Sequence, residues 1–481
     1  MGDLSPGFYY MYFIGLDIGT TSISLVLLEG ECRKLNSAIT VPNEFSLSSN
    51  QDFIKTQDPN QIVMTCQRLL QETLTPMPYL EQREVKAIGL TGQMHGVLYV
   101  DEKGRAVSPL FTWQDQSGDQ IYQEKETYAA YASRISGFPL ATGFGSTTLF
   151  YHTKTGQVPG EAVRICTIAD YLAMHLVGGR VPKIHVSMAA SLGLFDLEVG
   201  QFDLQAIGHL QLDESLFPET VKEEIFLGKT VDGIPVAIPI GDNQASFLGA
   251  VGSSLATPDR QVLLNVGTGS QISLPVRTMK KVKKGEYRPY LNGTYLWVGS
   301  PLCGGYSYHL LKNFYQETLK VFAQDPKEEL YPLMNNLANE QYQKEKAHTD
   351  KMSDVLEVDT RFRGTREEPG LRGGISNLSE FNLGPADLTL GFLKGIAQEL
   401  HDYYLAFVES MENEETQESK VVSGHIHLIG SGNGLRKNPL LQEICGDFFE
   451  SPMSISDYSE EAASGCALLA GDLCRVMKTL K

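Results

Sequence analysis

The sequence predicts an α/β protein made of two domains of similar topology, with an active-site cleft between them. Three observations favour this class. The chain has 481 residues, which at about 150 residues per domain gives room for two to four domains. Its composition, 42% hydrophobic and 20% charged, is typical of a globular protein. A Gly-Thr hairpin follows Asp17 and a similar one follows Asn265, which indicates a duplicated unit.

The first predicted element is a β-hairpin. An apolar strand at residues 12–18 leads through Gly19, Thr20 and Thr21 into a second apolar run at residues 23–28. Two strands joined by a Gly/Thr turn are typical of a hairpin. The second copy has the same order of strand, polar residue, turn and strand, and its turn contains Gly267, Thr268, Gly269 and Ser270.

Helices are expected where apolar or small residues recur at helical spacing. Three stretches have this pattern: residues 121–136, 387–409 and 460–478, the last rich enough in small residues for close packing. Turn-rich segments on both sides of residue 245 predict a domain boundary there. We therefore expect an extension at residues 1–11, an N-terminal domain at 12–245 and a C-terminal domain at 246–481.

Composition and charge exclude several classes of function. Lys and Arg total 40 against 58 Asp and Glu, a net charge of −18, which argues against a nucleic-acid partner. No run approaches the roughly 18 apolar residues of a membrane span, and the first residues lack the basic region of a signal peptide. Seven cysteines without a C-x-x-C pair indicate reduced thiols. We expect a cytoplasmic protein that binds neither nucleic acid nor membrane.

The two hairpin turns are candidate phosphate sites. The standard phosphate loops are absent, since the segment before Gly228-Lys229-Thr230 has Glu223 where a P-loop needs glycine. Turns rich in backbone N–H and hydroxyl groups can nonetheless hold an anion, and Asp17 could orient water on Mg²⁺. A purely structural role for the two turns explains the pattern equally well.

A third glycine cluster lies between a predicted strand at residues 425–429 and a helix that begins near Asn438. Its central residues are Gly432, Asn433 and Gly434. A strand, glycine loop and helix in this order can bind adenosine. An ordinary connection between a strand and a helix explains the pattern equally well.

Asp242 follows the apolar run 236–240, a position where cleft residues are found in α/β proteins. There it could accept the proton of a hydroxyl group during phosphoryl transfer, although a solvated turn Asp is the simpler reading without context. Polar groups also crowd two apolar segments, residues 91–96 and 112–115. Amide, imidazole, indole and carboxylate groups together suit a polyol ligand.

Taken together, these segments resemble the FGGY carbohydrate kinase family of the actin-like ATPase superfamily. Eight motifs occur in the family's order from about residue 12 to 473. Among them are GLDIGTTSISLVLLE at the start, TQDP at 56–59, GLTGQMHGVLYVD at 89–101, GDNQASFLGAV at 241–251 and GSGNGLRKNPLLQEI at 430–444. Each motif alone is moderately specific, and eight in order are specific. The resemblance implies two actin-like (ribonuclease H-like) domains, the first binding sugar and the second ATP.

The resemblance assigns a role to each candidate residue. Asp242 is implied to be the catalytic base, and Asp17 to hold Mg²⁺ through water. The ATP phosphates are implied to contact Gly19, Thr20, Thr21, Gly267, Thr268, Gly269 and Ser270, and the adenosine Gly432, Asn433, Gly434 and Asn438. The sugar pocket is implied to contain Gln93, Met94, His95, Trp113, Asp115 and Asn243.

The implied reaction is transfer of a phosphoryl group from ATP to the terminal primary hydroxyl of a ketose. Residues 141–145, 167–178 and 430–438 resemble the branch of the family that converts sedoheptulose to its 7-phosphate. Xylulose or another pentulose or polyol stays an alternative substrate. A non-catalytic, nucleotide-switched binding protein is an alternative of a different class. A small-molecule ketose is the expected partner, and a homodimer remains open.

Overall fold

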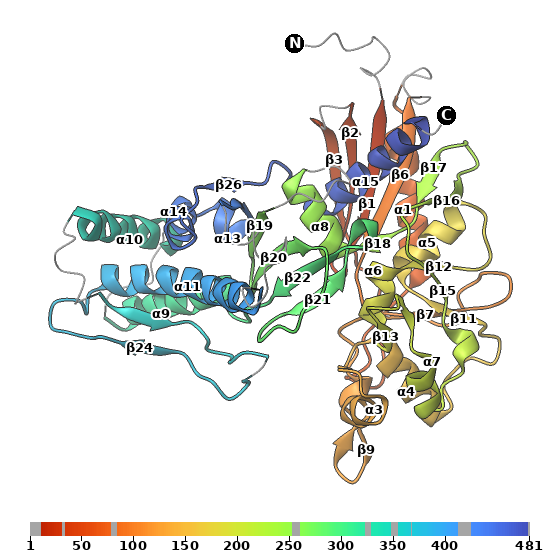
Figure 1. Ribbon diagram of the computed structural model, residues 1–481, viewed down its shortest axis with the longest axis horizontal. Helices are drawn as coiled ribbons and strands as arrows, with labels where there is room; N and C mark the ends of the chain where they lie inside the picture. Colours follow the sequence, from red (N-terminus) through yellow and green to blue (C-terminus); the bar gives the residue numbers. More distant parts are fainter. Residues whose placement is uncertain are drawn as a thin grey trace. The chain divides into compact units, whose positions relative to one another are not determined.

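The computed structural model describes residues 11–30, 34–77, 84–252, 260–322, 329–347, 355–366, 368–411 and 425–479. The predicted extension at residues 1–11 lies outside them except for Met11. The chain folds as two compact units, coloured along the sequence in Figure 1. Unit 1 comprises Met1–Thr257, Arg288–Thr294 and Tyr458–Lys481, and unit 2 comprises Pro258–Tyr287 and Tyr295–Asp457.

Unit 1 is built on a mixed β-sheet whose main path runs β16-β17-β6-β1-β2-β3. The hairpin β1–β2 is antiparallel, as predicted, β3 extends it on the β2 side, and β6 and β17 run parallel to β1 on the other side. The short strand β18 pairs with the end of β6. The strands are β1 (Tyr12–Ile18), β2 (Ser22–Glu29), β3 (Lys34–Pro42), β6 (Val85–Gly92), β16 (Phe226–Lys229), β17 (Pro235–Ala237) and β18 (Ile240–Gly241).

Alternate residues of β1 face two different layers of helices, because successive side chains of a strand point to opposite faces. Ile14 and Leu16 share a buried cluster with α1 (Pro59–Leu74) and α5 (Ile168–Leu176). On the other face, a Cβ on Gly15 would lie 1.8 Å from the carbonyl oxygen of Ala463. Only glycine allows α15 (Glu461–Thr479) to approach so closely, which confirms the predicted close packing of the last helix.

The structure corrects the helix predicted at residues 121–136. Only its second half is helical, as α3 (Tyr128–Ser136), while residues before it form the hairpin β9 (Ile121–Gln123) and β10 (Glu126–Thr127). Glu124 and Lys125 take positive φ angles of 48° and 87° at the turn, which a helix cannot accommodate. The Thr127 side chain then accepts a hydrogen bond from the N–H of Ala130 and starts the helix.

Unit 2 repeats the sheet topology of unit 1, with the order β21-β22-β20-β19-β25-β26. Here too a central hairpin, β19–β20, is extended by an antiparallel strand on one side and by parallel strands on the other. The predicted duplication is therefore present in the fold. The strands are β19 (Gln261–Val266), β20 (Ser270–Val276), β21 (Glu286–Pro289), β22 (Tyr295–Gly299), β25 (His427–Ser431) and β26 (Met453–Ile455).

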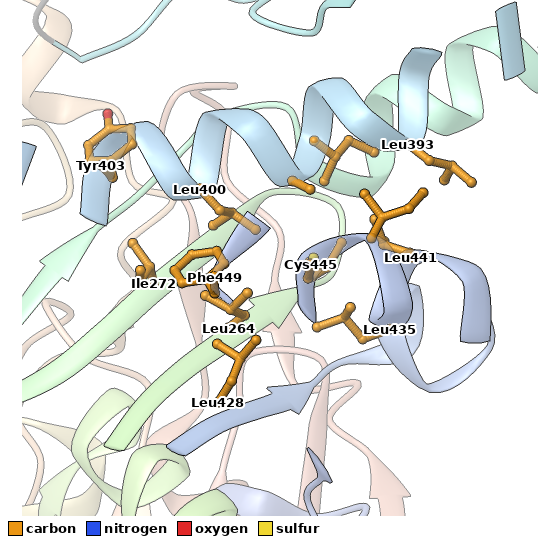
Figure 2. Packing of buried hydrophobic residues seen from close by; sticks show 14 of the residues in the cluster. Leu264, Ile272, Leu393, Leu400, Tyr403, Leu428, Leu435, Leu441, Cys445 and Phe449 are labelled. Carbon is orange, nitrogen blue, oxygen red and sulfur yellow. The ribbon is translucent and has the colours of Figure 1, made fainter. Parts of the chain in front are cut away.

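Four long helices accompany this sheet: α9 (Gly304–Phe322), α10 (Leu330–Ala347), α11 (Pro385–Met411) and α14 (Pro439–Phe448). Helix α11 is the one predicted at residues 387–409. Its Leu393 and Leu400 are fully buried against Leu264 and Ile272 of the hairpin strands and Cys445 of α14 (Figure 2). The apolar side of α11 thus forms much of the core of unit 2.

The two units are not separated at a single point near residue 245, because unit 1 contains three segments of the chain and unit 2 contains two. That residue lies inside α8 (Asp242–Val251), which packs on α15 within unit 1. The close packing of these two helices again requires glycine, since a Cβ on Gly465 would lie 1.8 Å from the carbonyl oxygen of Ala245. No helix among the described residues is long and apolar enough to span a membrane.

Candidate functional site

Strand register in unit 1 brings the two candidate carboxylates to one edge of the sheet. Asp17 on β1 and Ile240 on β18 both pair with Thr91 of β6, and the Thr91 hydroxyl donates to the Ile240 carbonyl oxygen at 2.8 Å. Asp242 follows one residue after β18 as the first residue of α8. Because these parallel strands end together, Asp17, Asp242 and the segment that starts at Gln93 share one edge.

Both carboxyl groups have raised pKa values, although each residue keeps some solvent exposure. Burial, together with the negative charges of Asp242 and Glu460, raises the pKa of Asp17 to about 7. Burial also raises the pKa of Asp242 to about 6, against the opposing effects of Arg288 and the backbone N–H of Asn243. Charged carboxylates are therefore disfavoured at this edge unless a cation or hydrogen-bond donor joins them.

The edge has features that fit a Mg²⁺ ion. The buried Oδ1 of Asp17 has no hydrogen-bond partner within the described ranges, and its neighbours Asp242 and Glu460 carry the same charge. Mg²⁺ prefers oxygen ligands and keeps several waters. No group of three His, Cys, Asp or Glu side chains in the described chain is arranged to hold a metal. The Oδ1 atom of Asp17 is an oxygen that such an ion could use as a ligand.

The turn of the first hairpin is fixed through its carbonyl oxygens. Four of them in sequence, from Ile18 to Thr21, accept a hydrogen bond from another part of unit 1. The donors are Gln93 N to Ile18 O (2.8 Å), Asn43 Nδ2 to Gly19 O (2.8 Å), Gln57 Nε2 to Thr20 O (2.8 Å) and Asn43 N to Thr21 O (2.9 Å). With its carbonyl groups bound to protein, the turn can offer its N–H groups and hydroxyls to an anion.

The Thr20 side chain joins the turn to two predicted sugar residues. Its hydroxyl donates to Gln93 Oε1 at 3.3 Å and accepts from Trp113 Nε1 at 2.8 Å. Gln93 in turn donates from Nε2 to Gln57 Oε1 at 2.9 Å. Thr20, Gln57 and Gln93 thus close a ring of hydrogen bonds beside a cavity of about 440 Å³ that Thr20, Gln57, Thr112 and Gln114 help to line.

Three more predicted sugar residues lie near the same edge. Met94 is buried against Gly241, where a Cβ would be 2.9 Å from its terminal methyl carbon. His95 has a positive φ of 72°, stacks on Phe144 with ring centroids 4.6 Å apart, and places Nδ1 2.6 Å from the carbonyl oxygen of Ser191. Asn243 keeps a buried Oδ1 without a partner among the described residues, which suits a ligand hydroxyl.

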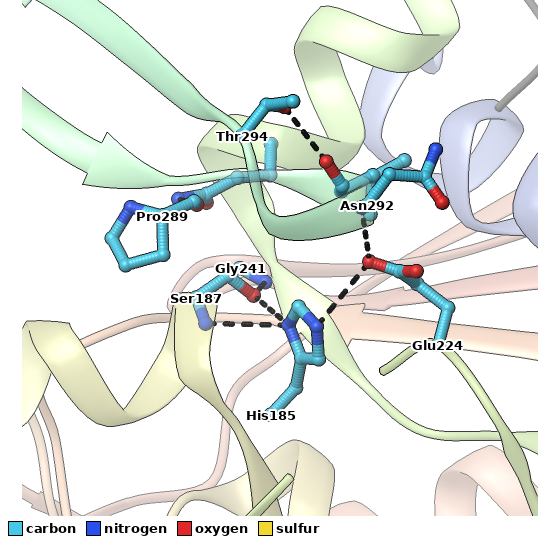
Figure 3. A network of polar contacts seen from close by, with 9 residues as sticks. His185, Ser187, Glu224, Gly241, Pro289, Asn292 and Thr294 are labelled. Atoms are coloured by element: carbon cyan, nitrogen blue, oxygen red, sulfur yellow. Dashed lines mark hydrogen bonds and ion pairs between the residues drawn. The ribbon is translucent and has the colours of Figure 1, made fainter. Parts of the chain in front are cut away.

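A polar network that was not predicted holds the backbone in front of Asp242 (Figure 3). The Ser187 hydroxyl accepts from Gly241 N at 3.0 Å and lies 2.7 Å from His185 Nδ1. His185 Nε2 lies 3.6 Å from Glu224 Oε1, which accepts from Asn292 N at 2.9 Å. His185 and Glu224 belong to no motif, so only the fold reveals that they act together.

The same network anchors the segment Arg288–Thr294 within unit 1. Besides the Asn292 bond, the Gln244 side chain donates to the Pro289 carbonyl oxygen at 2.8 Å, and the Tyr290 ring packs against Phe247 of α8 with centroids 5.6 Å apart. Arg288 is held beside the start of α8 in this way, which explains how its positive charge acts on Asp242.

In unit 2, the turn of the second hairpin is held by the start of α9. The carbonyl oxygens of Gly267 and Thr268 accept from the N–H groups of Gly305 (3.0 Å) and Tyr306 (2.9 Å). Thr268 is exposed and Ser270 is buried at the start of β20. The position that corresponds to Asp17 is Asn265, whose Nδ2 donates to the Ser431 hydroxyl at 2.9 Å.

The predicted adenosine turn lies directly against this hairpin. A Cβ on either Gly432 or Gly434 would be 2.6 Å from an atom of Val266, the last residue of β19. Gly432 also has a positive φ of 81°, so glycine is required there for two reasons. Asn433 is exposed next to them. Unit 2 therefore brings the predicted phosphate and adenosine segments together.

Two of the predicted ligand-contact residues have side chains that are buried and hydrogen-bonded within the protein. The Asp115 side chain is fully buried, and its carboxylate accepts from the backbone N–H groups of Lys55 and Ser117, both at 3.0 Å. It holds the loop that contains Ser117 against Lys55. Asn438 is 5% exposed and caps α14, with Oδ1 accepting from Leu441 N and Nδ2 donating to Asn335. Both ends of its amide are thereby engaged within the protein.

Comparison with known families matches almost the whole chain. The model of the FGGY family of carbohydrate kinases, N-terminal domain, matches residues 12–249, and that of the C-terminal domain matches residues 263–472. A sedoheptulokinase from Mus musculus is 26% identical and one from Homo sapiens is also 26% identical, each covering 95% of this chain and 96% of the relative.

Solved structures share the fold. A xylulose kinase from Rhodospirillum rubrum superposes with a TM-score of 0.76 at 22% identity, covering 96% of this chain and 90% of that one. A gluconate kinase from Lactobacillus acidophilus has a TM-score of 0.75 at 19% identity, covering 97% of this chain and 90% of that one. At these identities the likeness concerns the two-domain, actin-like fold.

Proposed function

This chain belongs to the FGGY family of carbohydrate kinases and is a phosphotransferase that acts on a sugar; we propose that its acceptor is the seven-carbon ketose sedoheptulose. The observation that carries the proposal is the match along 95% of the chain to relatives named sedoheptulokinase. A glycerol kinase from Rhodopseudomonas palustris (strain BisA53) matches 96% of the chain at 22% identity. Xylulose is the second candidate, because xylulose kinases are among the solved structures of the same fold.

Asp242 is proposed to be the base that receives the proton of the acceptor hydroxyl. Its place at the start of α8, beside the sugar segment of Gln93 and Met94, supports this role. A pKa of about 6 leaves Asp242 largely ionised at neutral pH, yet makes it a better proton acceptor than an ordinary carboxylate. Since a sugar hydroxyl is a far weaker acid, the proton moves late, as the bond to phosphorus forms.

The two Gly-Thr hairpins are proposed to bind the ATP phosphates, and the glycine turn around Asn433 the adenosine. The bound carbonyl groups of the first turn and the contact between Val266 and the glycine turn support these assignments. Asp17, with its unpartnered Oδ1, would hold Mg²⁺ through water. When bound, Mg²⁺ neutralises phosphate charge; the protein's part is to align donor and acceptor.

A reducing compartment, the cytoplasm, is proposed as the location. Six of the seven cysteines are free in the structure, and the seventh, Cys32, lies outside the described residues. Disulfide-free cysteines are typical of cytosolic proteins. Of the six described cysteines, five are buried and Cys474 is half-buried.

The substrate is tested by comparing kcat/KM for sedoheptulose, xylulose, ribulose and glycerol with MgATP, measured by coupled ADP release. We expect sedoheptulose to give the highest value. Preference for a pentulose would retain the kinase and reject the proposed sugar. Absence of sugar-stimulated ADP release from a protein that binds ATP would instead favour a nucleotide-switched binding protein.

The base is tested by Asp242→Asn, which keeps the shape of the side chain and removes its ability to accept a proton. We expect kcat to fall by about 10³-fold, within the range typical of a general base, while the affinity for MgADP stays nearly unchanged. Isothermal calorimetry measures the affinity, and Asp232→Asn in the turn before β17 is the control. Turnover like that of the wild type would reject Asp242 as the base.

A further inference from the structure

The ring formed by Thr20, Gln57 and Gln93 contains one residue that no assigned role explains. Gln57 is 2% exposed, and its side-chain amide is used at both ends: Nε2 donates to Thr20 O at 2.8 Å, and Oε1 accepts from Gln93 Nε2 at 2.9 Å. The ring closes where the Thr20 hydroxyl donates to Gln93 Oε1. All donors and acceptors are matched consistently around the ring, which fixes the orientation of both amides.

We propose that Gln57 is a positioning residue that couples the sugar pocket to the phosphate-binding turn of the first hairpin. The proposal rests on the function proposed above, in which Gln93 contacts the sugar and Thr20 and Thr21 contact phosphate. Gln57 touches neither ligand in this scheme. It transmits the position of Gln93 to the backbone of the turn.

The transmission follows from the geometry of the peptide bond. In a trans peptide the C=O and the next N–H point in opposite directions within one rigid plane. A donor that holds Thr20 O therefore also aims the N–H of Thr21. Gln57 supplies that donor, at 2.8 Å. When sugar hydroxyls bind Gln93 and fix its amide, Gln57 and the Thr20–Thr21 peptide are fixed with it.

Trp113 connects the ring of hydrogen bonds to the proposed sugar pocket. Its indole N–H donates to the Thr20 hydroxyl at 2.8 Å, and its side chain is 48% exposed. A sugar that packs against the indole would therefore act on Thr20 as well. A bound sugar would thus act on the turn by two routes. One runs through Trp113 to the Thr20 hydroxyl, and the other runs through Gln93 and Gln57 to the Thr20 carbonyl oxygen.

Asn43 provides an internal comparison. Its side chain holds the neighbouring carbonyl, Gly19 O, at 2.8 Å, and its backbone N–H holds Thr21 O. Its Oδ1 has no partner among the described residues, so Asn43 is not part of the ring. Asn43 and Gln57 thus each hold a carbonyl oxygen of the turn, but of the two only Gln57 is hydrogen-bonded to a proposed sugar-pocket residue.

The test compares Gln57→Glu with Asn43→Asp in steady-state kinetics, using whichever ketose the wild type phosphorylates best. Each change replaces a donating amide with a carboxylate that repels the carbonyl it held. We expect kcat to fall by about 10²-fold in both variants, as for a misplaced catalytic geometry. The KM for the sugar should rise several-fold in Gln57→Glu and stay unchanged in Asn43→Asp. Gln67→Glu, at an exposed position of α1, should behave as the wild type.

A loss of kcat without a change in sugar KM for Gln57→Glu would reduce Gln57 to a support like Asn43 and overturn the coupling. A change in sugar KM alone, or kinetics like those of the wild type, would overturn it too. Gln57→Met, which keeps the length but removes both hydrogen bonds, takes its place should the glutamate variant not fold.

A binding measurement separates this inference from the proposed function. Trp113 is the exposed one of two tryptophans, so its fluorescence can report sugar binding without turnover. We expect MgADP to tighten sugar binding to the wild type, because coupling is reciprocal, and to lose that effect in Gln57→Glu. An unchanged effect overturns the inference even in a chain whose substrate is another sugar, whereas failure of sedoheptulose alone leaves it standing.

Discussion

The two Gly-Thr hairpins share a topology but are held in place by different means. In unit 1, side-chain amides of Asn43 and Gln57 reach the carbonyl oxygens of Gly19 and Thr20. In unit 2, the N–H groups of Gly305 and Tyr306 at the start of α9 reach those of Gly267 and Thr268. Side chains can respond to a neighbouring ligand, whereas the backbone of a helix is stiff. The first hairpin is therefore suited to respond, and the second to provide a fixed platform.

The charge at the end of the central strand differs as well. Asp17, the last residue but one of β1, has a buried oxygen without a hydrogen-bond partner among the described residues. Asn265, at the same place in β19, donates from its side-chain amide to the Ser431 hydroxyl. A carboxylate next to Asp242 is costly without a cation, as the raised pKa values of both groups indicate. At this strand position the duplicated fold thus carries a carboxylate in one copy and a neutral amide in the other, which is expected where function, not stability, selects the residue.

The strongest test of this asymmetry exchanges the charge between the copies. Asp17→Asn should lower kcat by about 10²- to 10³-fold, as for loss of one electrostatic contact to a transition state, and should weaken the dependence of kcat on Mg²⁺. Asn265→Asp should cost less than about tenfold, because a carboxylate can still accept from the Ser431 hydroxyl. Initial rates over a series of Mg²⁺ concentrations measure both. Equal losses in the two variants would mean that the copies share the charge-dependent role.

A smaller effect is expected from disturbing the stiff hairpin. In Gly305→Ala the new methyl group would lie 2.4 Å from the Gly267 carbonyl oxygen, so the second turn must shift by several tenths of an ångström. We expect the KM for ATP to rise about tenfold and the KM for the sugar to stay unchanged. Gly374→Ala, where a Cβ meets nothing within 4 Å, is the control. A rise in sugar KM equal to that for ATP would show that both hairpins respond to both ligands.

Much of this arrangement was predictable from the sequence. The strands of the first hairpin, the repeat around Asn265 and the helices α11 and α15 follow from apolar periodicity and Gly-Thr turns, which are local signals. The family motifs supplied the candidate residues. Strand order, and the register that pairs both Asp17 and Ile240 with Thr91, were not predicted and come from the structure.

What the sequence did not predict depends on contacts between distant residues. Nothing local shows that the side chains of Asp115 and Asn438 bond to the backbone, since polar residues beside glycine or tryptophan look alike whether they bind ligand or backbone. His185 and Glu224 meet only in the fold. The helix predicted at residues 121–136 failed in its first half because the turn at Glu124 and Lys125 lacks glycine or proline, the usual signals of a hairpin.

The smallest effect concerns stability and separates the two units. Unit 2 buries Glu399 of α11 away from its hairpin, and burial raises the pKa of this side chain from 4.5 to about 7. The folded state therefore binds a proton that the unfolded state releases, and stability falls as pH rises from about 4.5 through 7. Glu399→Gln, which cannot ionise, should be more stable than the wild type by an amount on the order of 1–2 kcal/mol at pH 8.

Below pH 4.5 that difference should vanish, because the wild-type side chain is then protonated in both states. Thermal unfolding followed by the fluorescence of Trp297, the fully buried tryptophan of unit 2, in a Trp113→Phe background measures it. Glu409→Gln on the exposed side of the same helix is the control, and kcat should be unchanged in both variants. A stability gain that is equal at all pH values would mean that Glu399 is strained by packing and not by its charge, and the contrast between the proposed charged edge of unit 1 and the buried carboxyl of unit 2 would lose its support.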